Sequence, residues 1–412
     1  MDIFAFQGLC YRTDPILAGR RGGPPYDQID ESLRDRLHAD EHHFAHLIRP
    51  VAGGEDDPHR EAARLHAEWQ TTGIVSPDSR PSLYPYEIRL AAGGGRRLGL
   101  GALVALEEPA SGVIRPHEQT VAKTVDERLG LLRSTLADFE PILVLSDDRG
   151  QLDQLLSEDL ERLSPLVDHR DDAGHRHLLY RLTEPDRIAS YRRLLEPCTA
   201  VIADGHHRWE VARRFAEETN AKPGTPAATK LSVITSLSSS ALTIDPIHRA
   251  LPEVGALGEI DGVVLSRRAW TGGSGRELAA AVAESRQPAL GVWERGRAAE
   301  IWTLDPGAAP VDLPAGAREL TVTLLHGALL PAFGLPASAA TDGTVVYRSD
   351  PEHLFSELQS GDLAVGFWLP PMSAPGFSRA VAEGDLLPPK STRFLPKLAS
   401  GLVWAAHDTK LG

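Results

Sequence analysis

The sequence predicts a protein of the α+β class that carries a second, smaller α/β unit. Two short apolar stretches on either side of a glycine-rich turn predict paired strands between residues 83 and 106. Helical and extended patterns then alternate between residues 123 and 218. Beyond residue 251 the composition shifts towards Gly, Ala and short β-type runs, which predicts the second unit.

The individual elements follow from periodicity and turn residues. A proline-rich turn at residues 24–27 is expected because two successive prolines fix two backbone φ angles. Helices are predicted over 30–47, 123–138, 152–163, 186–195 and 209–218, and strands over 141–145, 177–182, 201–203, 288–293 and 299–304. The predicted domains are residues 1–251 and 252–370, with a C-terminal segment, residues 371–412, that packs back on the core.

Composition and charge argue against several classes of protein. The 42% hydrophobic and 24% charged fractions are those of a globular chain. A formal net charge of −14 argues against nucleic-acid binding, because a phosphate backbone is held by clustered Lys and Arg. Cys10 and Cys198 lack disulfide or metal-ligand spacing, which fits a reducing cytoplasm. No signal peptide or membrane span is predicted, so no membrane partner is expected.

The segment with the most chemical content joins a predicted strand to a predicted helix. It consists of Asp204, Gly205, His206, His207 and Arg208. A helix N-terminus offers backbone N–H groups and a positive dipole end, and an arginine in the first turn can bind a phosphate. Histidines can donate hydrogen bonds or transfer protons near neutral pH. The sequence therefore predicts an anion site, the alternative being a helix capped by Asp204 with two partly buried histidines.

A second polar segment, residues 117–120, precedes the helix predicted from residue 123. Glu118 is a candidate general base beside His117 and the hydroxyl of Thr120. The alternative is an ordinary helix start in which Thr120 is the cap.

A third segment near the C-terminus, residues 388–397, combines rigid prolines with cations and hydroxyls. Lys390, Ser391, Thr392 and Lys397 are candidates to neutralise phosphate charge. A solvated tail is the alternative, but the apolar residues that follow predict that this segment is packed down.

Four histidines stand on the predicted helix 30–47, namely His38, His42, His43 and His46. Spacing of i, i+4 can hold zinc, although no neighbouring Glu or Cys completes a ligand set. A polar helix face is the alternative.

Taken together, these segments resemble a bacterial and archaeal family known as domain of unknown function ten-fifteen. The resemblance spans nearly the whole chain and rests on residues 24–27, 117–120, 203–208 and 389–397. The segment 204–208 is also similar to the ParB/sulfiredoxin superfamily, which includes a free-serine kinase that uses ADP or ATP. That similarity implies a mixed-sheet ParB/sulfiredoxin-like core. His206 stands where sulfiredoxin has its catalytic cysteine, and no basic recognition helix is found, so sulfinic acid reduction and DNA segregation are disfavoured.

The resemblance implies a nucleotide-dependent phosphotransferase, similar to a serine kinase, that acts on a small hydroxyl compound with ATP or ADP and Mg²⁺. A regulatory switch that binds nucleotide without turnover and a small-molecule phosphatase are the alternatives. The expected catalytic residues are Glu118, Asp204, His206 and His207. The expected phosphate ligands are Gly205, His206, His207, Arg208, Lys390, Ser391, Thr392 and Lys397. The expected substrate contacts are Tyr26, Asp27, His117 and Thr120, and Asp27 is a third candidate base.

Overall fold

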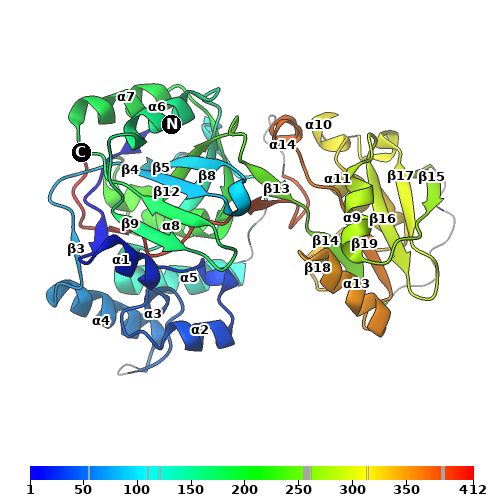
Figure 1. Cartoon of the computed structure of the whole chain (residues 1–412), viewed down its shortest axis with the longest axis horizontal. Coiled ribbons are helices and arrows are strands. Elements are labelled where there is room, and N and C mark those ends of the chain that lie inside the picture. Colours follow the sequence, from blue (N-terminus) through cyan, green and yellow to red (C-terminus); the bar gives the residue numbers. More distant parts are fainter. Residues whose placement is uncertain are drawn as a thin grey trace. The chain divides into compact units, whose positions relative to one another are not determined.

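The computed structural model describes residues 1–53, 56–108, 111–118, 120, 122–253, 260, 262–311, 313, 315–381 and 386–412. The chain forms two compact units (Figure 1). Unit 1 comprises Met1–Pro116, Thr120–Leu242 and Pro396–Gly412, and unit 2 comprises His117–Gln119 and Thr243–Leu395. The domains predicted at 1–251, 252–370 and 371–412 stay a prediction.

Unit 1 is built on a nine-stranded sheet. The strands follow in the order β6 (Ile114–Arg115), β11 (Ala200–Asp204), β8 (Ile142–Ser146), β12 (Thr229–Ser236), β5 (Arg96–Ala105), β4 (Tyr84–Arg89), β10 (Arg176–Leu179) and β9 (Val167–Arg170), with β1 (Ile3–Phe4) paired to β5. β12 runs parallel to β8 and β11 runs parallel to β6, whereas the other neighbours are antiparallel. The predicted α+β class with a mixed sheet is therefore confirmed, and β4 and β5 are the strands expected between residues 83 and 106.

Helices lie on both sides of this sheet. In the view of Figure 1, α6 (Gln151–Leu160) and α7 (Pro185–Leu195) lie above the sheet, and α5 (Ala122–Thr135) and α8 (His206–Glu218) lie below it. The remaining elements of unit 1 are β2 (Leu9–Tyr11), α1 (Pro15–Arg21), η1 (Tyr26–Gln28), α2 (Glu31–Leu37), α3 (Ala45–Ile48), α4 (Pro58–Thr71), β3 (Val75–Pro77), η2 (Ala91–Gly93), β7 (Ala137–Asp138), η4 (Pro226–Ala228) and β21 (Ala405–Ala406). None of the described helices is both long enough and apolar enough to cross a membrane.

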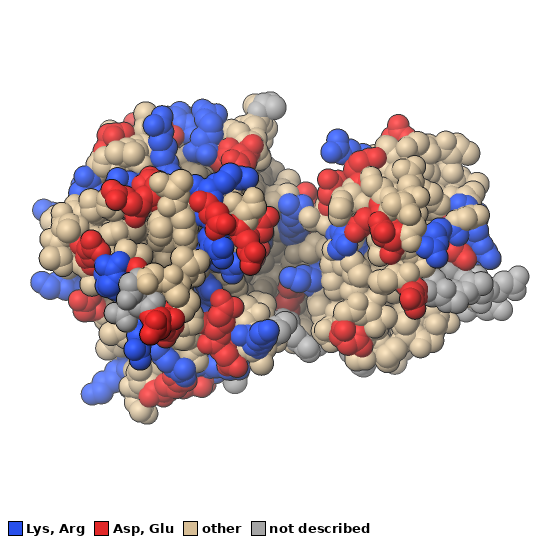
Figure 2. Space-filling model, turned by 90° about the horizontal axis from the view of Figure 1, so that it is seen from below, with Lys and Arg blue, Asp and Glu red and all other residues tan. Residues whose placement is uncertain are grey.

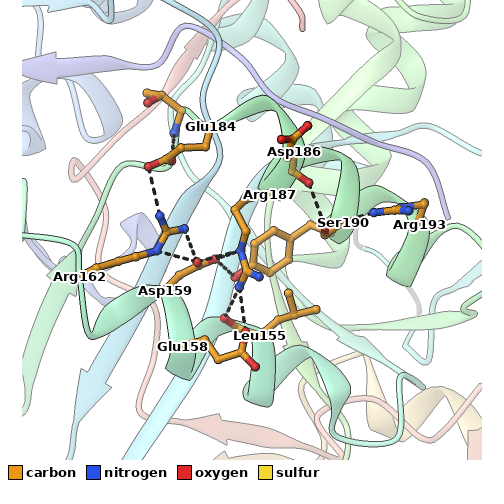
Figure 3. A network of polar contacts seen from close by, with 11 residues as sticks. Leu155, Glu158, Asp159, Arg162, Glu184, Asp186, Arg187, Ser190 and Arg193 are labelled. Atoms are coloured by element: carbon orange, nitrogen blue, oxygen red, sulfur yellow. Dashed lines mark hydrogen bonds and ion pairs between the residues drawn. The ribbon is translucent and has the colours of Figure 1, made fainter.

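The helices α6 and α7 are joined by a buried polar network (Figure 3). Asp159, which is fully buried, accepts hydrogen bonds from Arg162 Nη2 at 2.5 Å and from the hydroxyl of Tyr191 at 2.8 Å. The Nε atom of Arg187 lies 2.9 Å from the same carboxylate. A buried carboxylate is stable only when it is paired, so this network ties the two helices to each other.

The single helix predicted over residues 30–47 is wrong. α2 ends at Leu37 and α3 begins at Ala45. Between them, the carboxylate of Asp40 accepts a hydrogen bond from the backbone N–H of His42 at 3.0 Å, which is the local bonding by which Asp competes with a helix. The rings of His38 and His46 stack with centroids 3.9 Å apart instead of lining one helix face.

Unit 2 contains a six-stranded sheet whose strand pairs are all antiparallel among the residues that the structure describes. The order is β15 (Val264–Ala269), β17 (Glu300–Leu304), β16 (Ala289–Glu294), β19 (Val365–Trp368), β14 (His248–Leu251) and β18 (Val346–Arg348). One core cluster packs with α9 (Gly275–Ala283) and α13 (Pro351–Ser360), and another packs with α11 (Thr321–Leu324), the π-helical turn Leu325–Leu329 and α12 (Leu330–Ala332). The other elements are β13 (Thr243–Asp245), η5 (Pro306–Ala308), α10 (Ala315–Arg318), η7 (Ala337–Ala340), α14 (Ala374–Val381) and β20 (Arg393–Leu395).

The end of the chain returns to unit 1. β20 still pairs with β13 in unit 2, whereas Pro396–Gly412 belongs to unit 1. There Trp404 is fully buried and forms a bridge with Leu9, and β21 pairs with β7. The predicted packing of the C-terminal tail on the core is confirmed for this last stretch.

Candidate functional site

A single glycine connects β11 to α8. Gly205 adopts a left-handed conformation with φ 98°, and a Cβ atom at this position would lie 2.6 Å from Ile142 Cγ2. Only glycine fits this combination of backbone angle and close contact. As the N-cap residue of α8, Gly205 has no side chain with which to cap the helix. The helix therefore begins at His206 without the usual capping oxygen from the residue before it.

The carboxylate of Asp204 pairs with two cations. One oxygen contacts Lys397 Nζ, and the other accepts a hydrogen bond from Arg208 Nη2 at 2.9 Å. Burial raises the pKa of Asp204, but the charges of Lys397 and Arg208 outweigh burial and hold that pKa below its ordinary value. In this structure Asp204 organises cations, and Gly205 rather than Asp204 occupies the N-cap position.

Arg208 is anchored on both terminal nitrogens of its guanidinium. Nη1 donates to the carbonyl of Pro141 at 2.6 Å, Nη2 donates to Asp204, and the side chain is only 10% exposed. Burial lowers the pKa of Arg208, but the negative charges of Glu140, Asp204 and Asp27 outweigh it. These contacts favour a role in which Arg208 shapes the loop and contributes charge, and its predicted contact with phosphate stays a prediction.

The two histidines occupy the first turn of α8. His206 is buried, with 8% of its surface exposed, and His207 is half-buried. An electrostatic influence of His206 is the smallest of the named causes that act on the pKa of Asp204, and it acts in the same direction as Lys397 and Arg208.

The proline-rich turn lies close to Arg208. The backbone N–H of Tyr26 donates to Glu140 Oε1 at 3.0 Å, and the guanidinium of Arg128 lies 4.3 Å from the centroid of the Tyr26 ring. Burial raises the pKa of Tyr26 to about 12, although Arg208 and Arg128 act in the opposite direction. Asp27 is exposed. The predicted substrate contacts Tyr26 and Asp27 therefore both interact electrostatically with Arg208 of the loop 204–208.

Several charged residues of this region carry no sequence motif. Arg97 is buried and donates to the carbonyl of Pro396 at 2.7 Å, which fixes the residue before Lys397. Lys230 is also buried, contacts Asp138 and donates to the carbonyl of Glu140 at 2.8 Å. A lysine inside the apolar strand β12 was a detectable signal, whereas Arg97 resembles any exposed arginine after a turn.

A pocket that is partly open to solvent lies beside Arg208. Leu131, Leu132, Val211 and Ala212 line its apolar part, and Arg128, Asp138, Glu140, Arg208 and Lys230 supply its charged part. The loop 204–208 is therefore next to a space with both apolar and charged walls.

A second group of predicted site residues meets in unit 2. Glu118 Oε1 accepts hydrogen bonds from the backbone N–H of Ser391 at 3.2 Å and from the hydroxyl of Thr392 at 3.4 Å. His117, which is fully buried, lies 2.7 Å from that hydroxyl through Nε2. Lys390 has a left-handed backbone with φ 58°, which is uncommon for a residue other than glycine.

The predicted site residues therefore fall into two groups. Unit 1 holds Tyr26, Asp27, Thr120, Asp204, Gly205, His206, His207, Arg208 and Lys397, and unit 2 holds His117, Glu118, Lys390, Ser391 and Thr392. Thr120 is exposed. The motif at residues 389–397 is divided between the units after Leu395, so its two lysines belong to different units.

The structure offers little to a metal ion by itself. Over the described ranges, no group of three or more His, Cys, Asp or Glu side chains could hold one.

On the face drawn in Figure 2, cationic and anionic side chains are intermixed, so the visible charges do not form a field of one sign.

The fold and this loop define an α+β protein in which a strand passes through one glycine into a helix flanked by cations. The chain belongs to the family described as "Protein of unknown function (DUF1015)", whose model matches residues 3–261.

Comparison with solved structures gives low-scoring similarities. A conserved hypothetical protein from Pyrococcus furiosus is 13% identical, with a TM-score of 0.36 over 72% of this chain and 90% of that one. A free serine kinase in complex with AMP is 14% identical, with a TM-score of 0.37 over 72% of this chain and 87% of that one. SbnI with a C-terminal truncation, from Staphylococcus aureus, is 11% identical, with a TM-score of 0.34 over 72% of this chain and 83% of that one. A search of curated proteins returns no match.

Proposed function

We propose that this protein is a nucleotide-dependent phosphotransferase that acts on a small hydroxyl compound, with free serine or a close analogue as the acceptor and ATP or ADP as the phosphate donor. The observation that carries the proposal is the charge balance at the start of α8. Lys397 and Arg208 bring two cations to the positive end of a helix, where both contact Asp204 and where Glu140 and Asp27 also act on Arg208. An anion is the ligand that such a place favours.

Phosphoryl transfer suits this arrangement because its catalysis consists mainly of positioning and charge stabilisation. In the proposal, the backbone at Gly205 and the side chains of His206, His207 and Lys397 bind phosphate oxygens. Arg208 holds the loop in shape from its anchor on the carbonyl of Pro141. Lys390, Ser391 and Thr392 are the phosphate ligands proposed from unit 2.

The general base is proposed among three carboxylates. Asp204 is the weakest candidate for the base, because Lys397 and Arg208 lower the pKa of its carboxyl group. A carboxylate that acts as a good base near neutral pH needs a pKa above its ordinary value. Glu118 and Asp27 remain, in unit 2 and unit 1 respectively. Tyr26, His117 and Thr120 are proposed to contact the substrate.

Mg²⁺ is part of the proposal as the ion that would supply positive charge to the phosphate groups of the nucleotide. The carboxylate of Asp204 is already paired with cations, whereas Asp27, whose charge also acts on Arg208, is exposed. Mg²⁺ commonly keeps several waters and binds through one or two carboxylates plus substrate phosphates, a mode that needs no dedicated cage of protein ligands.

The test is to incubate the purified chain with ATP or ADP, Mg²⁺ and a panel of amino acids, and to follow phosphorus by NMR. Formation of phosphoserine or a related phosphate ester supports the proposal. Release of inorganic phosphate alone would indicate a phosphatase, and nucleotide binding without turnover would indicate a regulatory switch. Either of these last two results would contradict the phosphotransferase.

A matched pair of lysine variants tests the anion site itself. We expect Lys397→Ala to weaken ADP binding by about 10- to 100-fold, because a charge-assisted contact contributes about 1.5–3 kcal/mol. Lys222→Ala, which removes an exposed lysine after α8, should leave the affinity unchanged. Titration calorimetry with ADP measures both, and equal affinities for the two variants would contradict the assignment of Lys397.

A further inference from the structure

Arg249 of unit 2 is a fully buried arginine, and each of its three guanidinium nitrogens donates to a protein acceptor. It lies in β14, where it pairs with Tyr347 of β18 and with Phe367 of β19. Its guanidinium also lies 5.1 Å from the centroid of the Tyr347 ring. A buried guanidinium is costly unless its hydrogen bonds are satisfied, so the acceptors around it show what it holds in place.

Two of those acceptors are consecutive carbonyls of the loop that contains Lys390. Arg249 Nη2 donates to the carbonyl of Pro389 at 3.1 Å and to the carbonyl of Lys390 at 2.9 Å. Nη1 donates to the carbonyl of Ile247 in the neighbouring part of the chain. One planar group therefore ties the loop to the sheet.

The same loop carries the hydrogen bonds to Glu118. Directly after Lys390, the backbone N–H of Ser391 and the hydroxyl of Thr392 both donate to Glu118 Oε1. The left-handed backbone of Lys390 is a conformation that persists only where the surroundings impose it. Arg249 supplies that constraint at the carbonyl of Lys390 itself.

The remaining donor of Arg249 is held by His326. Arg249 Nε donates to His326 Nε2 at 3.2 Å, so that imidazole nitrogen must accept a hydrogen bond and the ring must be neutral. His326 lies in the π-helical turn Leu325–Leu329, a rare element that often occurs at functional sites. The acceptor for Arg249 Nε is therefore a side chain of this π-helical turn.

The loop that Arg249 holds is accessible from one side. A pocket that is partly open to solvent is lined by Arg249 and Ser391 among other residues, all of unit 2. A ligand entering this pocket would meet the backbone that Arg249 fixes.

We infer that Arg249 and His326 form a positioning pair that holds the loop of residues 388–392, and through it Glu118, in a working geometry. The inference rests on the proposed function insofar as Glu118, Lys390, Ser391 and Thr392 take part in it. Neither Arg249 nor His326 is a catalytic residue. Their contribution is the orientation of groups that are.

The test compares variants that remove or keep the acceptor for Arg249 Nε in the full-length chain. His326→Leu removes the acceptor, and His326→Gln places an amide oxygen within a similar reach. His353→Leu is the matched control, because His353 is an exposed histidine of unit 2 whose side chain is 60% exposed. Arg249→Lys serves as a second loss variant if His326→Leu does not fold, because a single ammonium cannot reach all four acceptors.

The first readout is hydrogen–deuterium exchange of a peptide spanning residues 386–395. We expect exchange in this peptide to accelerate about tenfold or more in His326→Leu, to return to the wild-type rate in His326→Gln, and to stay unchanged in His353→Leu. Unchanged exchange in a folded loss variant would overturn the inference.

The second readout separates positioning from stability. We expect kcat of His326→Leu to fall about 10- to 100-fold, since small displacements of catalytic groups have effects of that size, and KM for the nucleotide to rise as well, because the same loop carries the proposed phosphate ligands Lys390, Ser391 and Thr392. A lower melting temperature with unchanged kcat would also overturn it. If the wild-type chain shows no phosphoryl transfer, the proposed function fails, and the exchange experiment alone decides whether the pair holds the loop.

Discussion

Gly205 and Gly224 have similar left-handed backbones in different surroundings. Their φ angles are 98° and 77°. A Cβ atom added to Gly205 would lie 2.6 Å from Ile142 Cγ2, whereas a Cβ atom added to Gly224 would meet nothing within 4 Å. The first position therefore combines a backbone requirement with a packing requirement, and the second has the backbone requirement alone.

This contrast predicts unequal effects of two alanine substitutions. We expect Gly224→Ala to cost about 1 kcal/mol of unfolding free energy, which is the backbone penalty. Gly205→Ala should cost about 2–4 kcal/mol, because overpacking adds about 1–3 kcal/mol. Urea denaturation measures both values. Equal losses would show that the loop relaxes around the added methyl group.

Asp204 predicts a dependence of stability on pH. The folded-state pKa of this carboxyl is lowered, so its contribution is complete above the unfolded value of about 3.8 and is lost as pH falls through the folded value. The unfolding free energies of the wild type and Asp204→Asn should therefore differ most near neutral pH and converge in acid. Denaturation curves from neutral pH to below pH 3 measure the gap, and a gap that is constant with pH would contradict the pairing of Asp204 with Lys397 and Arg208.

Among the helices, α6 and α7 depend on one another through Asp159. Its carboxylate is fully buried and contacts two partly exposed arginines and the buried Tyr191, so its removal would leave the hydroxyl of Tyr191 without this acceptor. Glu158, one residue earlier in α6, pairs with Arg187 from a side chain that is 61% exposed. These two neighbours separate a buried carboxylate from a surface one.

We expect Asp159→Ala to lower the unfolding free energy by about 1–3 kcal/mol, the usual cost of leaving a buried polar group, here the hydroxyl of Tyr191, without its hydrogen-bond partner. Glu158→Ala, as the control, should cost about 0–1 kcal/mol because solvent screens its contact. Urea or thermal unfolding of the two variants gives the comparison. A small effect at Asp159 would mean that water replaces the lost carboxylate.

The positions of single helices and strands could be predicted from the sequence wherever they depend on the spacing of neighbouring residues. Helical patterns located α5, α6 and α7, and short apolar runs located β8, β16 and β17, each with bounds a few residues away from those of the structure. Between residues 38 and 44 the prediction was wrong, because the local hydrogen bond of Asp40 interrupts a helical pattern that continues in the sequence. Periodicity does not register such a competing bond.

Over the whole molecule, each unit has hydrophobic clusters of its own. One cluster of unit 1 joins α6 and α7 to the large sheet, and the clusters of unit 2 lie around β16, β17 and β19. Phe367, in β19, is fully buried in one of the latter. Loss of its ring should therefore affect unit 2 first.

We expect Phe367→Ala to destabilise unit 2 by about 3–5 kcal/mol. Amide exchange should accelerate in peptides from β16 and β19 and stay slow in peptides from β8 and β12. Hydrogen–deuterium exchange with mass spectrometry resolves the two sets. Equal acceleration in both sets would show that the units unfold together and not separately.

The site could be predicted only in part, and the reason is the distance along the chain between its members. The motif at residues 204–208 was visible because its residues are adjacent. Lys397 was proposed as a phosphate ligand, but its contact with Asp204 joins residues 193 positions apart. Arg97 and Arg249 donate to backbone carbonyls, which every residue possesses. The residue types at the acceptor positions therefore give no sign of these contacts in the sequence.

The division of unit 1 along the chain has a consequence for biosynthesis. A ribosome makes residues 243–395 before it reaches Pro396, so the nascent chain must carry the whole of unit 2 while unit 1 still lacks its final strand and the indole of residue 404. Asp204 and Arg208 are therefore made well before the ammonium group of Lys397. A chain that stops before Lys397 cannot complete the cation pair on this carboxylate.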